Sequence, residues 1–300
     1  MSRKTNRIIK DSVSYKIFIV AAYALILVWS FLCIAPFLNM IAISMSASKY
    51  ADAFQVGLWP KGFTLAYYGE ALTNNQILSS LWISVKRAVL GVVLELFVTM
   101  LAAYPMSKDK REFPGRGILS ALFIFCMIFS GGLIPNYYLI VNTLNLANTL
   151  WALVLPTMLN IGNLILMMNF IRQLPREIEE AALIDGCGYF RTLWKIILPL
   201  SVNSILTLTL FISIGHWNSW FDGMIYMKEV SNYPLSTFLY TIRDKLDKVE
   251  NQEQARLVLQ YSKQGLIMTY VVICTLPIIL LYPILQKYVK KGLVIGSVKG

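Results

Sequence analysis

Long runs of apolar residues, separated by short polar segments, dominate the pattern of the chain. Crossing a hydrocarbon core of about 30 Å takes roughly 20 helical residues, and runs of this order occur six times. They lie near Ile17–Ile43, Ala88–Pro105, Ile118–Val141, Leu150–Ile171, Leu200–Phe221 and Leu266–Leu285. The runs are continuous rather than alternating, and backbone polar groups must be paired in lipid, so they predict helices rather than barrel strands. The predicted fold class is an all-α membrane protein with six transmembrane helices.

The composition supports this prediction and excludes several classes of protein. Hydrophobic residues make up 57% of the 300 residues and charged residues only 14%, a balance more apolar than a soluble core needs. The four cysteines show no paired spacing, so neither a disulfide framework nor a metal site is expected. The single histidine, His216, has no Gly-x-Ser-x-Gly or His-Glu-x-x-His motif beside it, so hydrolytic catalysis is not expected.

Basic residues set the predicted orientation. The first run follows five Lys and Arg residues but is too long for the apolar part of a signal peptide, so we expect an uncleaved span and a cytoplasmic N-terminus. Six spans return the C-terminus to the cytoplasm, and most of the 27 Lys and Arg residues then lie on the inner side. The net charge of +11 is therefore assigned to the inner membrane face, and no nucleic-acid partner is expected. The expected parts are a cytoplasmic N-terminal segment (1–16), a six-span transmembrane domain (17–285) with an inner loop (172–199) and a large outer loop (222–265), and a cytoplasmic C-terminal tail (286–300).

Two glycine-containing stretches superficially resemble nucleotide-binding motifs, and both fail on context. Residues 129–133 (FSGGL) lie at the end of an apolar run, and residues 186–188 (GCG) lack a third glycine and a preceding strand. No Gly-x-x-x-x-Gly-Lys sequence occurs in the chain. We therefore expect no ATP hydrolysis by this chain, so that any energy for its work comes through a partner.

The charged stretch LPREIEEAALIDGCGYFRTLWKIILPL at residues 174–200 interrupts two apolar segments. Pro175 suits the first position of a helix, and the glutamates that follow it favour the positive end of that helix. Gly186 fits the left-handed residue that follows a helix C-terminus. The sequence predicts one short helix over Pro175–Asp185 and a second over Tyr189–Leu198 that stops before the next proline.

Two roles are open for the first of these short helices. A helix lying on lipid favours Lys and Arg on its polar face, because the cytoplasmic leaflet is negative, and the three glutamates near its start argue against that role. Ala181 and Ala182 indicate close backbone approach to another protein, and Glu180 offers a charge to a cationic partner. The stretch is better interpreted as a helix that docks on a protein at the inner face.

Several motifs resemble one family. Glu180-Ala181-Ala182-x-x-Asp185-Gly186, followed by Ile197-x-Pro199, resembles the coupling-helix motif of ABC importer permeases. Further matching segments are residues 101–105 (LAAYP), 131–135 (GGLIP), 215–221 (GHWNSWF), 286–288 (QKY) and 292–300 (GLVIGSVKG). Together they resemble maltose-type carbohydrate permeases, and most of all the subgroup associated with polysaccharide-derived and uronate-containing oligosaccharides. Cys187 stands where the family usually has Ala, which leaves this interpretation unchanged.

This resemblance implies a fold and a set of partners. It implies the type I ABC importer permease fold, with a coupling helix that sits in a cleft of an ATPase subunit and contacts it through Glu180, Ala181, Ala182, Asp185 and Gly186. It also implies a second, different permease subunit, two ATPase subunits that bind ATP and Mg, and an extracytoplasmic sugar-binding protein. No cofactor is expected in this chain itself. In the family the tail of the smaller permease reaches between the ATPase subunits, which implies that role for Gly296, Lys299 and Gly300.

A few polar and aromatic residues inside the predicted spans are candidates for a translocation path. Glu95, near the middle of its span, is either a polar wall of the path, or a packing contact with another helix or a protonated carboxyl. Lys86 and Arg87 are expected to extend to the outer interface. Two roles are open for a further group of residues. They form either a face that stacks on sugar rings or an aromatic belt at the lipid headgroups. This group comprises Trp217, Asn218, Trp220 and Phe221.

The sequence thus predicts a permease subunit in a bacterial cytoplasmic membrane that imports an oligosaccharide by alternating access, driven by ATP hydrolysis on its partners. An alternative keeps this architecture and changes the cargo to a non-sugar solute such as a peptide. An intramembrane enzyme is disfavoured because no nucleophile–base pair is present. The charged stretch Asp222–Gln264 is expected to be a long outer loop, and the family resemblance implies that it contacts the docked binding protein.

Overall fold

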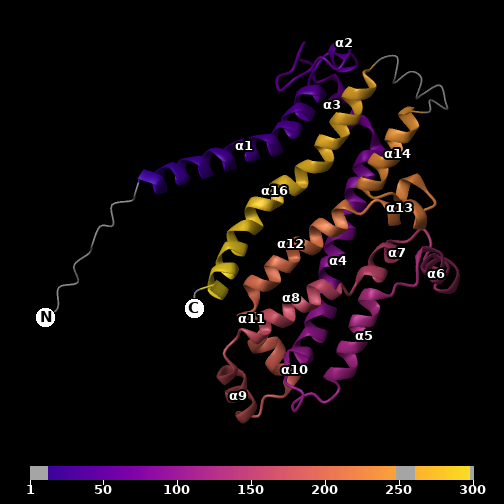
Figure 1. The fold of residues 1–300 in the computed structure, drawn as a ribbon. Helices are drawn as coiled ribbons and strands as arrows, with labels where there is room; N and C mark the ends of the chain where they lie inside the picture. The colour runs from indigo at the N-terminus through magenta and orange to yellow at the C-terminus, as the bar shows by residue number, and fades with distance from the viewer. Residues whose placement is uncertain (1–12, 248–260, 298–300) are drawn as a thin grey trace. The chain divides into compact units, whose positions relative to one another are not determined.

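The computed structural model describes residues 13–247 and 261–297, and the regular secondary structure of these residues is helical. The one strand-like feature in this part of the chain is an isolated bridge between Ser46 and Phe63. Figure 1 shows the helices coloured along the chain. The chain divides into two compact units, which are residues 1–69 with 251–272 and residues 70–250 with 273–300.

The first unit is built on α1 (Val13–Ser44), which is apolar around its circumference. Its described side chains become buried in this chain only at the end of the helix, at Ala42, Ile43 and Ser44. A helix that is apolar on all sides is typical of a membrane span. The unit also contains α2 (Ser48–Ala51), the start of α3 (Ala66–Thr73) and the start of α16 (Lys263–Ser297).

In the second unit, α8 (Ile161–Arg172) and α12 (Val202–Asn218) pack along the long helix α4 (Asn75–Ser107). Asn74 caps the start of α4 by accepting a hydrogen bond from the backbone N–H of Gln76 at 2.9 Å. The core between these helices is apolar and buried. It comprises Met100, Ala103, Tyr104, Leu164, Met167, Ile171, Leu193, Ile197, Leu208 and Ile212. This packing fixes the polar side chains that the same helices carry.

Shorter helical segments complete the second unit. They are α5 (Arg116–Ile128), α6 (Leu133–Tyr138), α7 (Leu150–Val154), α9 (Arg176–Ile184), α10 (Tyr189–Thr192), α11 (Leu198–Leu200), α13 (Phe221–Tyr226) and α14 (Leu235–Asp247). Wider π-helical turns cover Leu139–Thr143 and Leu193–Ile197, and 3-10 turns cover Leu155–Thr157 and Val230–Asn232.

Three helices of the described chain are long and apolar enough to cross a membrane alone, and the total rises to as many as six if each of three bent helix pairs is one span. The predictions of continuous helices over Ile118–Val141 and Leu150–Ile171 are therefore wrong, because these segments bend by 108° and 53°. The first break contains Gly132 at φ +83°, and Asn160 caps a new helix after the second. Apolar content alone does not register such breaks.

The second short helix differs from its prediction. The helical segment that begins at Tyr189 was expected to stop at Leu198, but it continues to Leu200 and then turns by 81° into α12. The π-helical turn Leu193–Ile197 directly precedes the proline of α11. A wider turn is compatible with a residue that lacks a backbone N–H, so the proline here follows a turn of helix rather than ending it.

The described part of the predicted outer loop (222–265) is largely helical. Within the described part of residues 222–265, α13, a 3-10 turn and α14 follow one another; the 3-10 turn and α14 pack against α4, and α13 packs against α7 and α14. The Leu235 N–H donates to the Ser84 hydroxyl at 2.7 Å, and the Gln76 amide donates to the Val230 carbonyl at 2.5 Å. The charges that suggested a loop belong in part to an amphipathic helix. Residues 248–260 lie outside the described residues.

Candidate functional site

α9 is the first of the two short helices predicted between spans. It begins one residue later than predicted, because Pro175 is the cap rather than the first helical residue. At its other end Gly186 has a φ of +81°, and the N–H groups of Gly186 and Cys187 donate to the carbonyls of Leu183 at 3.1 Å and Ala182 at 2.9 Å. The left-handed glycine ending predicted from the sequence is confirmed.

Two ion pairs fasten α9 to the end of α4 and the turn that follows it. The Glu179 carboxylate pairs with the Lys108 ammonium and accepts a hydrogen bond from the Tyr104 hydroxyl at 2.5 Å. One turn earlier in α9, Arg176 Nη1 lies 2.9 Å from Asp109 Oδ2 in an exposed pair. The hydrogen bond from Arg176, together with its charge, holds the pKa of Asp109 below its usual range. From the sequence, Glu179 was assigned only to the positive end of the helix, and this anchor was not predicted.

The opposite face of α9 is exposed. Four of the predicted coupling residues are exposed, namely Glu180, Ala181, Asp185 and Gly186. Ala182 is only 6% exposed and packs inside this chain, so of the two alanines only Ala181 is available to a partner. Ile184, three residues further on, is 85% exposed and lies on the same side of the helix. An apolar side chain this exposed among charged residues is a feature that the sequence analysis missed.

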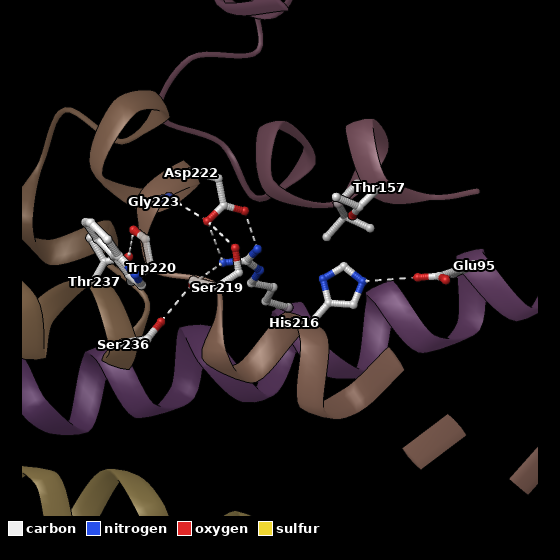
Figure 2. Close-up of polar contacts among 11 residues, drawn as sticks. Glu95, Thr157, His216, Ser219, Trp220, Asp222, Gly223, Ser236 and Thr237 are labelled. Atoms are coloured by element: carbon white, nitrogen blue, oxygen red, sulfur yellow. Dashed lines mark hydrogen bonds and ion pairs between the residues drawn. The ribbon is translucent and has the colours of Figure 1, made fainter. Parts of the chain in front are cut away.

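Arg87 is buried, which corrects the expectation that it extends to the lipid interface. Its side chain is 1% exposed, and the guanidinium contacts the Asp222 carboxylate through Nη1 at 3.2 Å and also through Nη2. Nη1 also donates to the Ser219 carbonyl at 3.0 Å. Asp222 accepts further hydrogen bonds from the Ser219 hydroxyl and the Gly223 N–H (Figure 2). The partner lies 135 positions away, which no local pattern reveals. Lys86 is exposed as predicted.

One turn further along α4, Gly91 makes room for His216 of α12. A Cβ at Gly91 would overlap the imidazole ring. A further turn on, Glu95 is 4% exposed and accepts a hydrogen bond from the Asn163 amide at 2.6 Å. Its other oxygen lies 3.8 Å from His216 Nε2, and Figure 2 shows the two side chains pointing toward one another. Small or polar residues recur every fourth position from Arg87, a spacing that would have revealed this face.

A cavity of about 220 Å³ opens beside this cluster. Its lining includes Arg87, Glu95, Thr157, Asn163, Phe211 and His216. Glu95 therefore makes the packing contact with another helix that one interpretation expected, and it also lines a polar cavity; its place in a translocation path stays a prediction. The Nε of Arg87 is buried and has no hydrogen-bond partner among the described residues, and Phe211 is 49% exposed. The cavity thus offers a carboxylate, hydrogen-bond donors and an aromatic ring.

The aromatic residues around the end of α12 do not form one surface. Trp217 is 7% exposed, and its Nε1 donates to the Cys274 carbonyl of α16 at 3.0 Å. Trp220 instead stacks on Tyr240, with the ring centroids 4.1 Å apart, and Asn218 is exposed. Trp217 is thus a packing residue in this chain, whereas Trp220 and Asn218 keep some access to their surroundings.

The structure gives less information on the predicted tail contact. Gly296 lies next to the last residue of α16, and Lys299 and Gly300 lie outside the described residues. The contact of this tail with an ATPase therefore stays a prediction. In the described part of the chain, no group of three or more His, Cys, Asp or Glu side chains is placed to hold a metal ion.

Comparisons with known proteins identify the class of the chain. It is 40% identical over 267 residues to Protein LplC of Bacillus subtilis strain 168, an alignment that covers 89% of this chain and 90% of the relative. It is 34% identical over 286 residues to the polygalacturonan/rhamnogalacturonan transport system permease protein YtcP of the same organism, covering 95% and 99%.

A solved structure shares the fold. It belongs to a bacterial ABC transporter involved in the import of the acidic polysaccharide alginate, with a TM-score of 0.82 and 28% sequence identity over 92% of this chain and 98% of that chain. The predicted ABC importer permease fold is therefore confirmed, as is the prediction that the chain is a transport subunit rather than an enzyme. Residues 76–295 match the family described as the inner membrane component of binding-protein-dependent transport systems, and the chain belongs to that family.

Proposed function

We propose that this chain is the permease subunit that carries an oligosaccharide across the bacterial cytoplasmic membrane by alternating access. The observation that carries the proposal is its likeness, over nearly the full length of both chains, to a permease of the alginate importer. The polygalacturonan/rhamnogalacturonan permease, 34% identical, also belongs to a system for sugar polymers. The Glu95 cavity, with its polar groups and aromatic ring, supports an oligosaccharide as the cargo.

The proposed assembly contains a second, different permease subunit, two ATPase subunits that bind ATP and Mg, and an extracytoplasmic sugar-binding protein. The dependence on a binding protein is a property of the family. The exposed apolar surface of α1 supports contact with lipid and with the second permease. The membrane path in this chain includes Glu95, with Asn218 and Trp220 at the end of α12.

α9 is the proposed coupling helix. Its exposed residues Glu180, Ala181, Asp185 and Gly186, together with Ile184, form the surface offered to an ATPase subunit. The ion pairs of Glu179 and Arg176 tie the helix to α4, so a movement of the ATPase is passed directly to a membrane-spanning helix. The C-terminal tail from Gly296 to Gly300 adds a second ATPase contact in this proposal.

The orientation proposed places both termini, α9 and the turn after α4 in the cytoplasm. The basic residues Lys108, Lys110, Arg172 and Arg176 gather at that side, as the positive-inside rule requires. The segment between α6 and α7 and the elements α13 and α14 then lie on the outer side, where the binding protein docks.

The test of this function is transport by the complete complex. The permease pair and the ATPases are reconstituted in liposomes with the cognate binding protein, and uptake of labelled oligosaccharides is compared with uptake of peptides of similar mass. We expect ATP-dependent uptake of an oligosaccharide only. Uptake of a peptide without uptake of any sugar would show that the cargo is the non-sugar alternative.

A further inference from the structure

We propose that the cavity between α4, α8 and α12 is a subsite for one neutral sugar ring, and that its charges disfavour a uronate ring. This inference rests on the proposed function, because it specifies where one ring of the imported oligosaccharide binds and that this ring is uncharged. The cavity volume of about 220 Å³ lies below the range of roughly 300–1,000 Å³ that is usual for drug-sized ligands. Such a volume suits a single ring of a longer chain.

The lining matches the two surfaces of a sugar ring. A sugar ring has an apolar face and an edge of hydroxyl groups, so its site needs an apolar surface and a few fixed polar groups. The half-exposed ring of Phe211 supplies the first. Oε2 of Glu95 lies 3.8 Å from His216 Nε2, which is too long for a hydrogen bond, so this oxygen remains able to accept one from a hydroxyl.

Arg87 supplies a donor to the same cavity. Its Nε–H is buried without a partner among the described residues, whereas Nη1 donates to Asp222 and Ser219 and Nη2 donates to Asp222. A buried donor that is left unpaired costs free energy, and a small shift of the Arg87 side chain toward a ligand hydroxyl would remove that cost. This orphaned donor is an observation independent of the cavity shape, and it also indicates a ligand at this point.

The charges of the lining distinguish a hydroxyl from a carboxylate. The positive charge of Arg87 is already paired with Asp222, and the other titratable groups of the described lining are Glu95 and His216. The Nε2 of His216 lies 3.8 Å from the Glu95 carboxylate, so a protonated His216 would already have that carboxylate as its counter-charge. A uronate carboxylate entering the cavity would therefore lose its water without meeting an unpaired cation, which is costly. A neutral hydroxyl would exchange one set of hydrogen bonds for another.

Gly215 allows the charge of the cavity to be changed without a steric cost. It lies one turn after Phe211 in α12, lines the cavity, and a Cβ built on it meets no heavy atom within 4 Å. Gly215→Lys adds a positive charge to the cavity, which offsets the charge of Glu95, and Gly215→Gln is the uncharged control of similar reach. Both residues favour a helix more than glycine does, so neither should weaken α12.

The experiment measures binding of galactotriose and trigalacturonate, which differ only by a carboxylate on each ring. The assembled permease–ATPase complex is placed in lipid nanodiscs without binding protein and titrated by saturation-transfer difference NMR. We expect the native complex to bind galactotriose about tenfold more tightly, a difference of about 1.4 kcal/mol. Gly215→Lys should reduce this preference for galactotriose over trigalacturonate by a similar factor, and Gly215→Gln should leave the preference unchanged. Phe211→Ala should abolish galactotriose binding.

Three results would overturn this inference: equal or tighter binding of trigalacturonate by the native complex, equal ratios for the Lys and Gln variants, or undiminished binding by Phe211→Ala. Absence of galactotriose binding by a native complex that hydrolyses ATP would also reject the subsite. None of these results would reject the proposed function, because ATP-dependent uptake of sugar from the loaded binding protein is measured separately on the native transporter.

Discussion

Arg87 of α4 and Asp222 of α13 form a two-point ion pair with side chains that are 1% and 19% exposed. The pair joins a central membrane helix to the segment that follows α12, and the Ser236 hydroxyl donates to the Ser219 carbonyl at 2.8 Å beside it (Figure 2). The turn after α12 is therefore held from two sides. Because a buried charge is tolerated only with its partner, each of the two residues depends on the other.

Removal of one member of this pair should destabilise the protein strongly. Asp222→Ala leaves the Arg87 charge buried, and breaking a buried pair costs about 3–5 kcal/mol. We expect a large drop in the thermal midpoint of the detergent-solubilised complex. Asp109→Ala, which breaks the exposed pair with Arg176, is the control and should have little effect. Equal shifts for the two variants would show that burial of the first pair has no energetic consequence.

The contact between Gly91 and His216 should tolerate no side chain at position 91. A Cβ there overlaps the imidazole ring, and overpacking of this kind costs about 1–3 kcal/mol. Gly91→Ala should lower the thermal midpoint, and adding His216→Ala should recover much of the loss. Gly215→Ala, one residue from the histidine but facing open space, should be neutral. An unchanged midpoint for Gly91→Ala would contradict the close approach of the two helices.

The left-handed ending of α9 should be required for coupling. Gly186 has a φ of +81°, and a residue with a Cβ is strained there by about 1 kcal/mol or more. Gly186→Val and Glu180→Lys should still insert and assemble, but loaded binding protein should no longer stimulate ATP hydrolysis, and uptake should fall. Gly188→Val is the matched control, since Gly188 has a φ of −70° and open space around it. If loaded binding protein stimulates ATP hydrolysis in both test variants as it does in the native complex, α9 is not part of the energy-coupling pathway.

The anchor of α9 on α4 should affect how efficiently ATP hydrolysis is used. Glu179→Gln keeps an acceptor for the Tyr104 hydroxyl but loses the ion pair with Lys108. Since the ATPase-facing residues are intact, hydrolysis should persist while the amount of sugar moved per ATP falls. Glu177→Gln, on an exposed part of the same turn, should keep the native ratio. A native ratio in Glu179→Gln as well would show that the anchor does not transmit movement.

The proposed orientation predicts the accessibility of two exposed positions. In a background without the four native cysteines, Asn145→Cys should react with an impermeant thiol reagent in intact cells. Lys110→Cys, in the turn after α4, should react only after the membrane is permeabilised. Labelling of Lys110→Cys in intact cells would contradict the proposed orientation.

The sequence by itself determined the helical membrane class and the ending of α9, because both depend on local chemistry. A run of apolar residues must form a helix in lipid whatever its neighbours are, and a glycine after a helix terminates it through its own φ. For the same reason the motif Glu180–Gly186 was recognised without any tertiary information. Helix breaks such as that at Gly132 were missed because the prediction followed apolar content and gave glycine too little weight.

Only the tertiary structure decided which charges are buried and what they contact. Arg87 was expected at the interface because its partner Asp222 lies far away in the chain. Glu179 was assigned to a helix terminus because Lys108 reaches it only after α4 and α9 meet. His216 reaches the cavity at Glu95 because Gly91 leaves room for its ring against α4. Pairwise contacts between distant segments follow from packing, and the pattern of a single chain does not specify them.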